Sequence, residues 1–228
     1  MTRATIAGVV AAMIGTVGVS AQTTRGDLEA WPAVAVTAPV GDRVEIRADG
    51  LFQVTDGVSR VSRELLRIVV MGDLNTHLAL GGGYTWTRVD LTGDRVVEHR
   101  AVQQIDVRIP VRSGASGVSS RTRLEDRRQQ HQAAMAFRLR EQVRLDVPLA
   151  ARRVRAVVWS EYFHSINSTA WSGESGPALA LTFVGLHIPV SRRTTIEPGY
   201  LNQTNFIVGR NQSRHVVAVF FAMRLSQS

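Results

Sequence analysis

Three consecutive stretches of this chain alternate charged and apolar residues, and this alternation limits the available folds more than any other feature. The stretches are residues 98–109, 120–128 and 134–147. The middle stretch has four charged residues spaced two apart, namely Arg121, Arg123, Glu125 and Arg127. Successive side chains of a β-strand point to opposite faces, so these four share one face and Leu124 lies on the other. The pattern predicts neighbouring strands that each have a charged face and an apolar face.

The rest of the chain also divides into short alternating or apolar segments, and none of useful length has helical periodicity. Eleven strands can be counted, one about every 19 residues, which suits strands of about 9–11 residues tilted through a membrane. Because bacterial single-chain barrels have even strand numbers, we expect about twelve strands, with ten as the alternative. Short connections rich in Pro, Gly or Asp alternate with longer polar ones, as in outer-membrane barrels. The longer loops are expected at residues 52–63, 88–96, 164–176 and 204–214.

The first 21 residues have the features of a cleaved signal peptide. Arg3 is followed by an apolar run over residues 4–19, and Val19-Ser20-Ala21 fits the small-residue cleavage pattern. We therefore expect a signal peptide at 1–21 and a single β-barrel domain at 22–228. The chain has no cysteine, which excludes a disulfide framework, a cysteine-ligated metal and a lipidated N-terminal cysteine.

All 27 basic residues are arginine, and the formal net charge is +8. A basic chain can bind nucleic acid. Here, however, the arginines are spread over many strands and interleaved with Glu and Asp, so no single basic patch forms. We therefore expect no nucleic-acid partner.

The charged faces could line a lumen or face water, and alternation alone does not decide between these arrangements. Tyr84 and Trp86 end an otherwise aliphatic face, as interfacial aromatics of a membrane barrel do. The opposite face has the small residues Ala79, Gly81 and Gly83, which suit a crowded interior. These features predict an all-β fold, an antiparallel up-and-down transmembrane β-barrel in the outer membrane of a Gram-negative cell. The alternative is a secreted soluble β-sandwich or barrel that acts as a binding module.

Several short motifs carry a resemblance to a known family. They are Glu98-His-Arg100, Gln103-Gln104, Arg121-Thr-Arg-Leu-Glu125-Asp-Arg127, Arg138-x-Arg140, Pro148-Leu149, Glu161-x-Phe163 and Gly199-Tyr-Leu-Asn-Gln203. With these motifs the chain resembles, over residues 28–225, a family of bacterial outer-membrane-like β-barrels catalogued as a domain of unknown function. The Arg-x-Arg-x-Glu-x-Arg run is the most specific of them. The resemblance implies a fold and a location. It does not indicate an activity, because none is established for the family.

The sequence shows no clear catalytic or metal site. His164-Ser165, with Asn167 and Glu161, is similar to the Ser/His chemistry of barrel lipases, but adjacent strand residues point to opposite faces. The six histidines lack metal-ligand spacing. Gly81-Gly-Gly83 lacks the Gly-Lys-Ser/Thr of a phosphate loop, so barrel packing explains it better. We expect neither an enzyme, although a barrel hydrolase remains an alternative, nor a cofactor.

The predicted site is a lumen charge network of arginines and glutamates. Its predicted members are Glu98, Arg100, Arg108, Arg121, Arg123, Glu125, Arg127, Arg138, Arg140, Arg144, Arg155 and Glu161. Guanidinium groups bind carboxylate, phosphate or sulfate, so an open lumen would make a porin-like channel that favours small anionic solutes. Alternatively, the network braces a barrel that conducts nothing. In either case we expect outer-membrane lipid and the barrel assembly machinery as partners.

Overall fold

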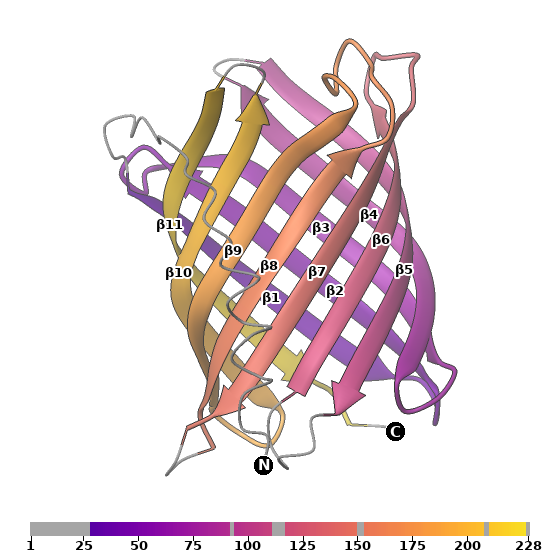
Figure 1. Cartoon of the computed structure of the whole chain (residues 1–228), viewed down its shortest axis with the longest axis vertical. Helices are drawn as coiled ribbons and strands as arrows, with labels where there is room; N and C mark the ends of the chain where they lie inside the picture. Colours follow the sequence, from indigo (N-terminus) through magenta and orange to yellow (C-terminus); the bar gives the residue numbers. More distant parts are fainter. Residues whose placement is uncertain (1–27, 92–93, 111–116, 150–152, 208–209, 227–228) are drawn as a thin grey trace, which may run out of the picture.

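The computed structural model describes residues 28–91, 94–110, 117–149, 153–207 and 210–226, and these form one closed β-barrel (Figure 1). The described residues make eleven strands: β1 (Glu29–Pro39), β2 (Val44–Thr55), β3 (Arg60–Asp73), β4 (Leu78–Leu91), β5 (Asp94–Pro110), β6 (Gly117–Gln129), β7 (Ala136–Pro148), β8 (Arg155–Ser165), β9 (Gly176–Pro189), β10 (Thr194–Ile207) and β11 (Arg210–Arg224). In this part of the chain no helix is long and apolar enough to span a membrane. The expected signal peptide, residues 1–21, lies outside the described residues.

Sequence neighbours pair antiparallel around the barrel, and one parallel pair closes it. β1 and β11 run side by side in the same direction, with partners from Glu29↔Val216 to Thr37↔Arg224. The predicted all-β barrel is confirmed, and its eleven strands are close to the expected twelve. Up-and-down strands whose first and last members pair antiparallel must be even in number. The parallel seam removes that requirement.

The connections at one end of the barrel are much shorter than the sequence analysis predicted. Residues 52–63, 88–96 and 204–214 belong mostly to strands, because β2, β4 and β10 continue to Thr55, Leu91 and Ile207. The polar residues there are paired in the sheet, since strand pairing depends on the backbone and tolerates polar side chains. Only the β8–β9 connection, orange at the top of Figure 1, is long, as expected.

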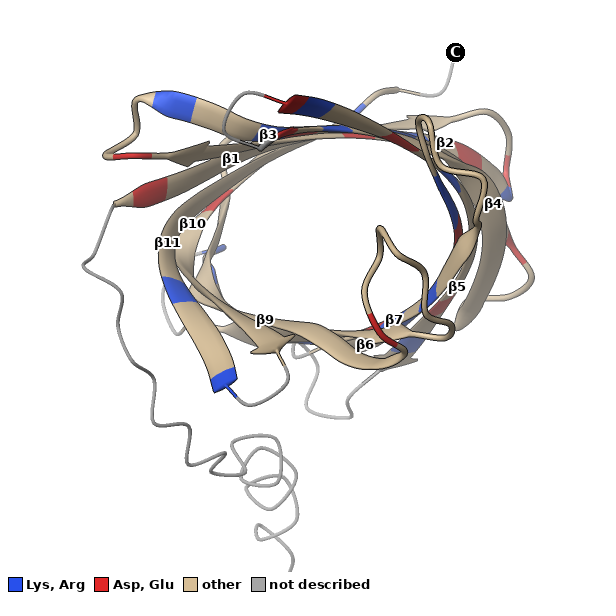
Figure 2. Cartoon of the chain, turned by 90° about the horizontal axis from the view of Figure 1, so that it is seen from above, with Lys and Arg blue, Asp and Glu red and all other residues tan. Residues whose placement is uncertain are grey.

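The charged faces point into the barrel and the apolar faces point outward. Glu125 is 0% exposed and Arg123 is 4% exposed, whereas Ile68, Ile105 and Val184 on outward positions are 49%, 43% and 52% exposed. Figure 2, a view along the barrel, shows blue and red segments mainly on the side of β2–β7, while β9 is uncharged throughout. The polarity of this barrel is thus inverted relative to a soluble one.

The other side of the interior is apolar. β8–β11 and β1 contribute a buried cluster of Trp31, Val157, Trp159, Phe163, Leu181, Phe183, Leu201, Val216 and Ala218. Trp159 stacks on Phe183 with ring centroids 5.3 Å apart, and Phe220 meets Phe183 edge-on, also at 5.3 Å. The lumen therefore has a charged wall on β2–β7 and an apolar wall on β8–β11 and β1.

Two glycines make room for the centre of the apolar wall. Gly185 and Gly199 are cross-strand partners on β9 and β10. A Cβ at either position would meet the ring of Phe183 and a backbone carbonyl oxygen, well inside van der Waals contact. The ring therefore lies over bare backbone, a packing arrangement in which an aromatic side chain covers strand glycines.

Candidate functional site

The candidate site is the middle of the charged wall, where six arginines surround three glutamates. We call this group the lumen network and define it as Glu98, Arg100, Arg121, Arg123, Glu125, Arg127, Arg138, Arg140 and Glu161. All nine lie on the inward faces of four consecutive strands, β5 to β8. The alternation that predicted these strands thus places every member of the network on one side of the sheet.

Glu125 lies at the centre of the lumen network. Its side chain is 0% exposed, and both of its oxygens accept hydrogen bonds from β7. Arg138 donates to Oε2 from Nε at 2.8 Å and from Nη2 at 2.5 Å, and Arg140 donates to Oε1 from Nη1 at 2.7 Å. Arg100 Nη1 lies 4.0 Å from Oε1. Arginines from two neighbouring strands therefore compensate this buried carboxylate.

The other two glutamates each join two arginines. Glu98 accepts from Arg100 Nε at 2.9 Å and from Arg127 Nε at 2.6 Å. Glu161 accepts from Arg140 Nη2 at 2.9 Å and from Arg121 Nη2 at 3.2 Å. Arg140 thereby bridges Glu125 and Glu161, and its guanidinium also lies 4.4 Å from the centre of the Phe163 ring. The network ties β5, β6, β7 and β8 together across their inward faces.

Arg123 differs from the other arginines of the network. Its Nε donates to the Gln104 side-chain oxygen at 2.6 Å, and its residue is 4% exposed. Among the described residues it has no carboxylate within ion-pair distance, and its buried Nη1 has no hydrogen-bond partner. Its cross-strand partner on β7 is another arginine, Arg140. Arg123 is thus a buried guanidinium without an ion-pair partner in the described part of the barrel.

A second group of ion pairs lies closer to the end of the barrel that has the β1–β2 and β3–β4 turns. Arg47 bonds Asp106 across the barrel interior from β2 to β5, at 2.5 Å. Arg67 makes two hydrogen bonds to Asp49, at 2.9 and 2.6 Å. Farther round, Arg144 pairs with Asp146 and with Glu197, and Glu197 also contacts His187. Two of these pairs, Arg47–Asp106 and Arg144–Glu197, join strands that are not neighbours in the barrel.

Three predicted members lie apart from the lumen network: Arg144, which belongs to the second group of ion pairs, and Arg108 and Arg155. Arg108, near the end of β5, pairs with Asp73 at 2.9 Å, and both side chains are about two-fifths exposed. Arg155 begins β8 and is exposed, and no described carboxylate lies within ion-pair distance of it. All three were predicted from strand parity alone, which gives the face of a residue and not its height in the barrel.

Between the two walls lies a cavity of about 480 Å³. It extends from Arg123 and Trp159 at mid-barrel to His187 and Thr195, near the turn that joins β9 to β10. The lumen network is buried on the charged wall and the hydrophobic cluster is buried on the apolar wall. Members of both groups line the cavity.

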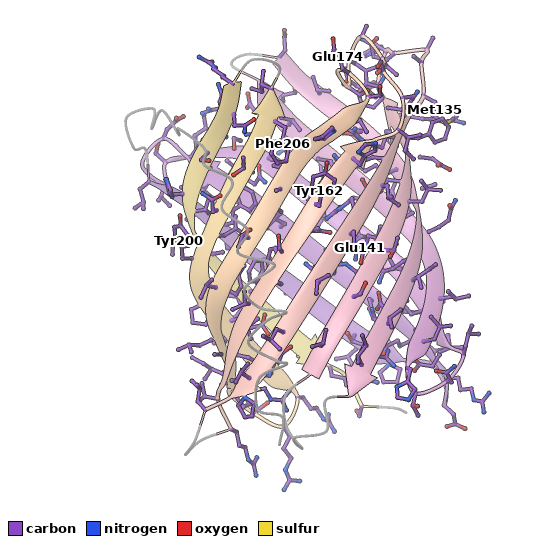
Figure 3. All side chains as sticks on the ribbon, viewed as in Figure 1. Met135, Glu141, Tyr162, Glu174, Tyr200 and Phe206 are labelled. Carbon is purple, nitrogen blue, oxygen red and sulfur yellow. The ribbon has the colours of Figure 1, made fainter. Side chains whose placement is uncertain are left out.

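Outward-facing aromatic residues lie on several strands. Tyr84 on β4 is 44% exposed, and its hydroxyl bonds the ring of His99 on β5. Tyr200 on β10 bonds His215 on β11 in the same way. Trp86 also faces outward, with the Arg88 guanidinium 6.0 Å from its ring centre. Figure 3 shows Tyr162 and Phe206 on the outward side of the barrel, where their rings lie 6.2 Å apart.

One carboxylate interrupts the apolar outer surface. Glu141, labelled on the barrel wall in Figure 3, points away from the lumen. The hydroxyl groups of Ser120 and Thr122 on β6 both donate to it. Its two oxygens are therefore bonded by the protein itself.

The residues considered for hydrolase chemistry do not form a nucleophile–base pair. Ser165 is buried on the inward face of β8, and the adjacent His164 points to the other face. The Asn167 side chain bonds the backbone of Met135 and Phe137. Asn167 thus anchors the β8–β9 loop to the start of β7.

Comparison with known proteins agrees with the resemblance drawn from the motifs. Residues 28–214 match the family described as "Protein of unknown function (DUF2490)". The chain belongs to this family. An uncharacterized protein of Methylorubrum extorquens is 36% identical over 181 residues, which cover 78% of each chain. The family match spans nearly all of the barrel, from the residue before β1 into β11.

Sequence reasoning missed Arg67 and the whole apolar wall of the lumen. The inward face of β3 mixes Arg63 and Arg67 with Leu65, Val69 and Met71, so its alternation is weak. β9 is apolar on both faces, and β8 is mostly so apart from Arg155 and Glu161, and this was the available signal. An apolar strand in a barrel with an apolar exterior must present apolar side chains to the lumen as well.

Proposed function

We propose that this protein is an outer-membrane β-barrel whose lumen is closed to ions at mid-height. The observation that carries the proposal is the inverted polarity of the barrel, with buried charges inside and exposed apolar residues outside. The expected signal peptide at residues 1–21 would supply the export route. In this proposal outer-membrane lipid and the assembly machinery are its partners, and the protein is not an enzyme.

The outer surface supports a lipid environment. Adjacent outward positions on β3, namely Leu66, Ile68 and Val70, are 54%, 49% and 49% exposed, and outward positions of β8, β9 and β11 are similarly apolar. Soluble monomers rarely expose contiguous apolar patches larger than a few hundred Å². Tyr84 and Tyr200 lie near the middle of β4 and β10, and their hydroxyl groups are bonded by the rings of His99 and His215 and need no water. Bonds from Ser120 and Thr122 satisfy the outward carboxylate of Glu141 without water.

The burial of the lumen network favours a closed barrel over a channel. Ions cross a pore through water or through a continuous row of coordinating groups. Here Glu98, Glu125, Arg100, Arg140 and Glu161 are each no more than 7% exposed, and they are bonded to one another. This burial and bonding support a lumen network that braces the barrel and conducts nothing. The second candidate, an anion-favouring channel, is favoured by the excess of arginine over carboxylate in the same network.

Fractionation of cells tests the proposed location. We expect the mature protein in the outer-membrane fraction, and we expect folded protein to migrate faster than boiled protein on a gel, because closed barrels resist detergent. A periplasmic soluble protein used as the marker should separate from it. Recovery of the folded protein in the soluble periplasmic fraction would contradict the proposal and favour a soluble binding module.

A further inference from the structure

The cavity beside the lumen network has an excess of positive charge. Six arginines line it, namely Arg47, Arg67, Arg121, Arg123, Arg140 and Arg144, together with three carboxylates, those of Asp49, Glu161 and Glu197. Five of the six have a carboxylate partner among the described residues. The sixth is Arg123. A guest in this cavity should therefore carry negative charge.

The position of an anionic group follows from the donors without partners. Arg121 and Arg123 are two residues apart on the inward face of β6, and both line the cavity. Arg121 Nε and Arg123 Nη1 are buried and have no hydrogen-bond partner. Leaving such buried donors without an acceptor is unfavourable, and more so for charged groups. One carboxylate between the two guanidinium groups would give both residues an acceptor.

The rest of the cavity lining is largely apolar. Trp159, Leu181, Leu201 and Phe220 on β8–β11 line it, together with Leu51 on β2 and Leu65 on β3. Trp31 also lines this side, and its buried indole N–H has no hydrogen-bond partner. A small inorganic anion would touch the arginines and leave this surface uncovered. A molecule with an apolar body would contact both walls.

We propose that the cavity binds an amphipathic anion that has one carboxylate head group and an apolar body. Arg123 and Arg121 hold the head group, and the wall around Trp159 and Phe220 holds the body. The volume of about 480 Å³ lies within the range of ligand sites, about 300–1,000 Å³. The inference goes beyond the proposed function, because the two walls face each other whether or not the barrel spans a membrane.

The test uses decanoate as the probe, with acetate and decanol as comparisons. The protein is the folded full-length mature barrel in amphipol, carrying Trp86→Phe and Trp171→Phe. Of the four tryptophans, this leaves Trp31 and Trp159, both of which line the cavity. Their fluorescence should change saturably with decanoate. Acetate has the head group alone and decanol has the body alone, so each should bind at least about ten-fold more weakly.

Arg123→Gln should weaken decanoate binding by about ten- to hundred-fold, the size of one charge-assisted hydrogen bond. Arg88→Gln is the matched control, since Arg88 lies on the outer face and does not line the cavity. Its affinity should equal that of the parent. A second variant, Ala33→Phe, fills the cavity from β1 and should abolish decanoate binding while Arg123 stays in place.

Three results would overturn the inference. Equal affinity for decanol and decanoate would make the site merely apolar. Equal affinity for acetate and decanoate would make it a plain anion site. Absence of saturable binding to protein that migrates as folded would mean that no such site exists. The location experiment is read by fractionation, so failure of ligand binding and failure of the proposed membrane location are distinguishable.

Discussion

Glu125 is a fully buried carboxylate with three arginines around it, and its burial is tolerated only because of them. Removing charges from water costs several kcal/mol per ion, and their mutual attraction and hydrogen bonds must offset this. In the lumen network the offset is shared, since Arg140 serves both Glu125 and Glu161. The loss of one member therefore affects partners on several strands.

Glu125→Gln should destabilise the folded barrel by about 3–5 kcal/mol, because it leaves Arg138 and Arg140 facing a neutral amide in a buried site. Urea-induced unfolding in detergent micelles, followed by tryptophan fluorescence, measures the change. Arg123→Gln should change the stability far less, since Arg123 has no carboxylate partner in the described part of the chain. Glu64→Gln is an outer-face control that should cost less than about 1 kcal/mol.

Equal losses for Glu125→Gln and Arg123→Gln would contradict this account. They would mean that the two side chains are compensated to the same extent. Little change in Glu125→Gln would mean that the network is hydrated and that its members are not truly buried.

At the level of single residues, the sequence predicted faces better than partners. Alternation in 120–128 predicts that Arg123 and Glu125 share one face, and in the structure both are buried on the inward face of β6. It could not show that Arg123 would meet Gln104, because that depends on the register of β5 against β6. Register is set by the whole ladder of backbone pairs, and a shift of two residues would preserve every face.

At the scale of strands, the parallel seam between β1 and β11 is the feature that sequence reasoning missed. Both strands are largely apolar on their outward faces, so their side chains do not reveal their direction. Strand direction follows from the count of hairpins between them. Eleven strands can be counted from the alternation, and the even strand numbers of bacterial barrels favour twelve, whereas the structure has eleven.

A disulfide across the seam tests this pairing. Val34 and Phe221 are register partners, and both are exposed on the outer face. Because the chain has no cysteine, Val34→Cys with Phe221→Cys forms a clean pair. Oxidation should cross-link them efficiently, since paired strands place their Cα atoms within the roughly 4.4–6.8 Å that a disulfide needs.

The control for the seam combines Val34→Cys with Val217→Cys, four residues further back on β11. This pair should stay reduced under the same oxidant, as judged by thiol labelling of the folded protein. A cross-link in the control and none between positions 34 and 221 would contradict the parallel register.

For the whole molecule, the two walls of the lumen explain why the charge pattern alone was an incomplete guide. The charged strands predicted an arginine-rich interior and left the opposite wall undefined. Glu125 and Arg140 are buried on the charged wall, Trp159 and Phe183 are buried on the apolar wall, and the cavity lies between the two walls. If the lumen is closed as proposed, the barrel would hold a molecule more readily than it would conduct ions.

Conductance in a planar lipid bilayer is the most direct test of a closed lumen. Folded protein, verified by its heat-dependent gel mobility, should insert without producing discrete current steps, and Arg123→Glu should leave the current at background. An anion-selective conductance would contradict the account, above all if Arg123→Glu or Arg140→Glu lowered or inverted the selectivity, because ions would then be passing the lumen network.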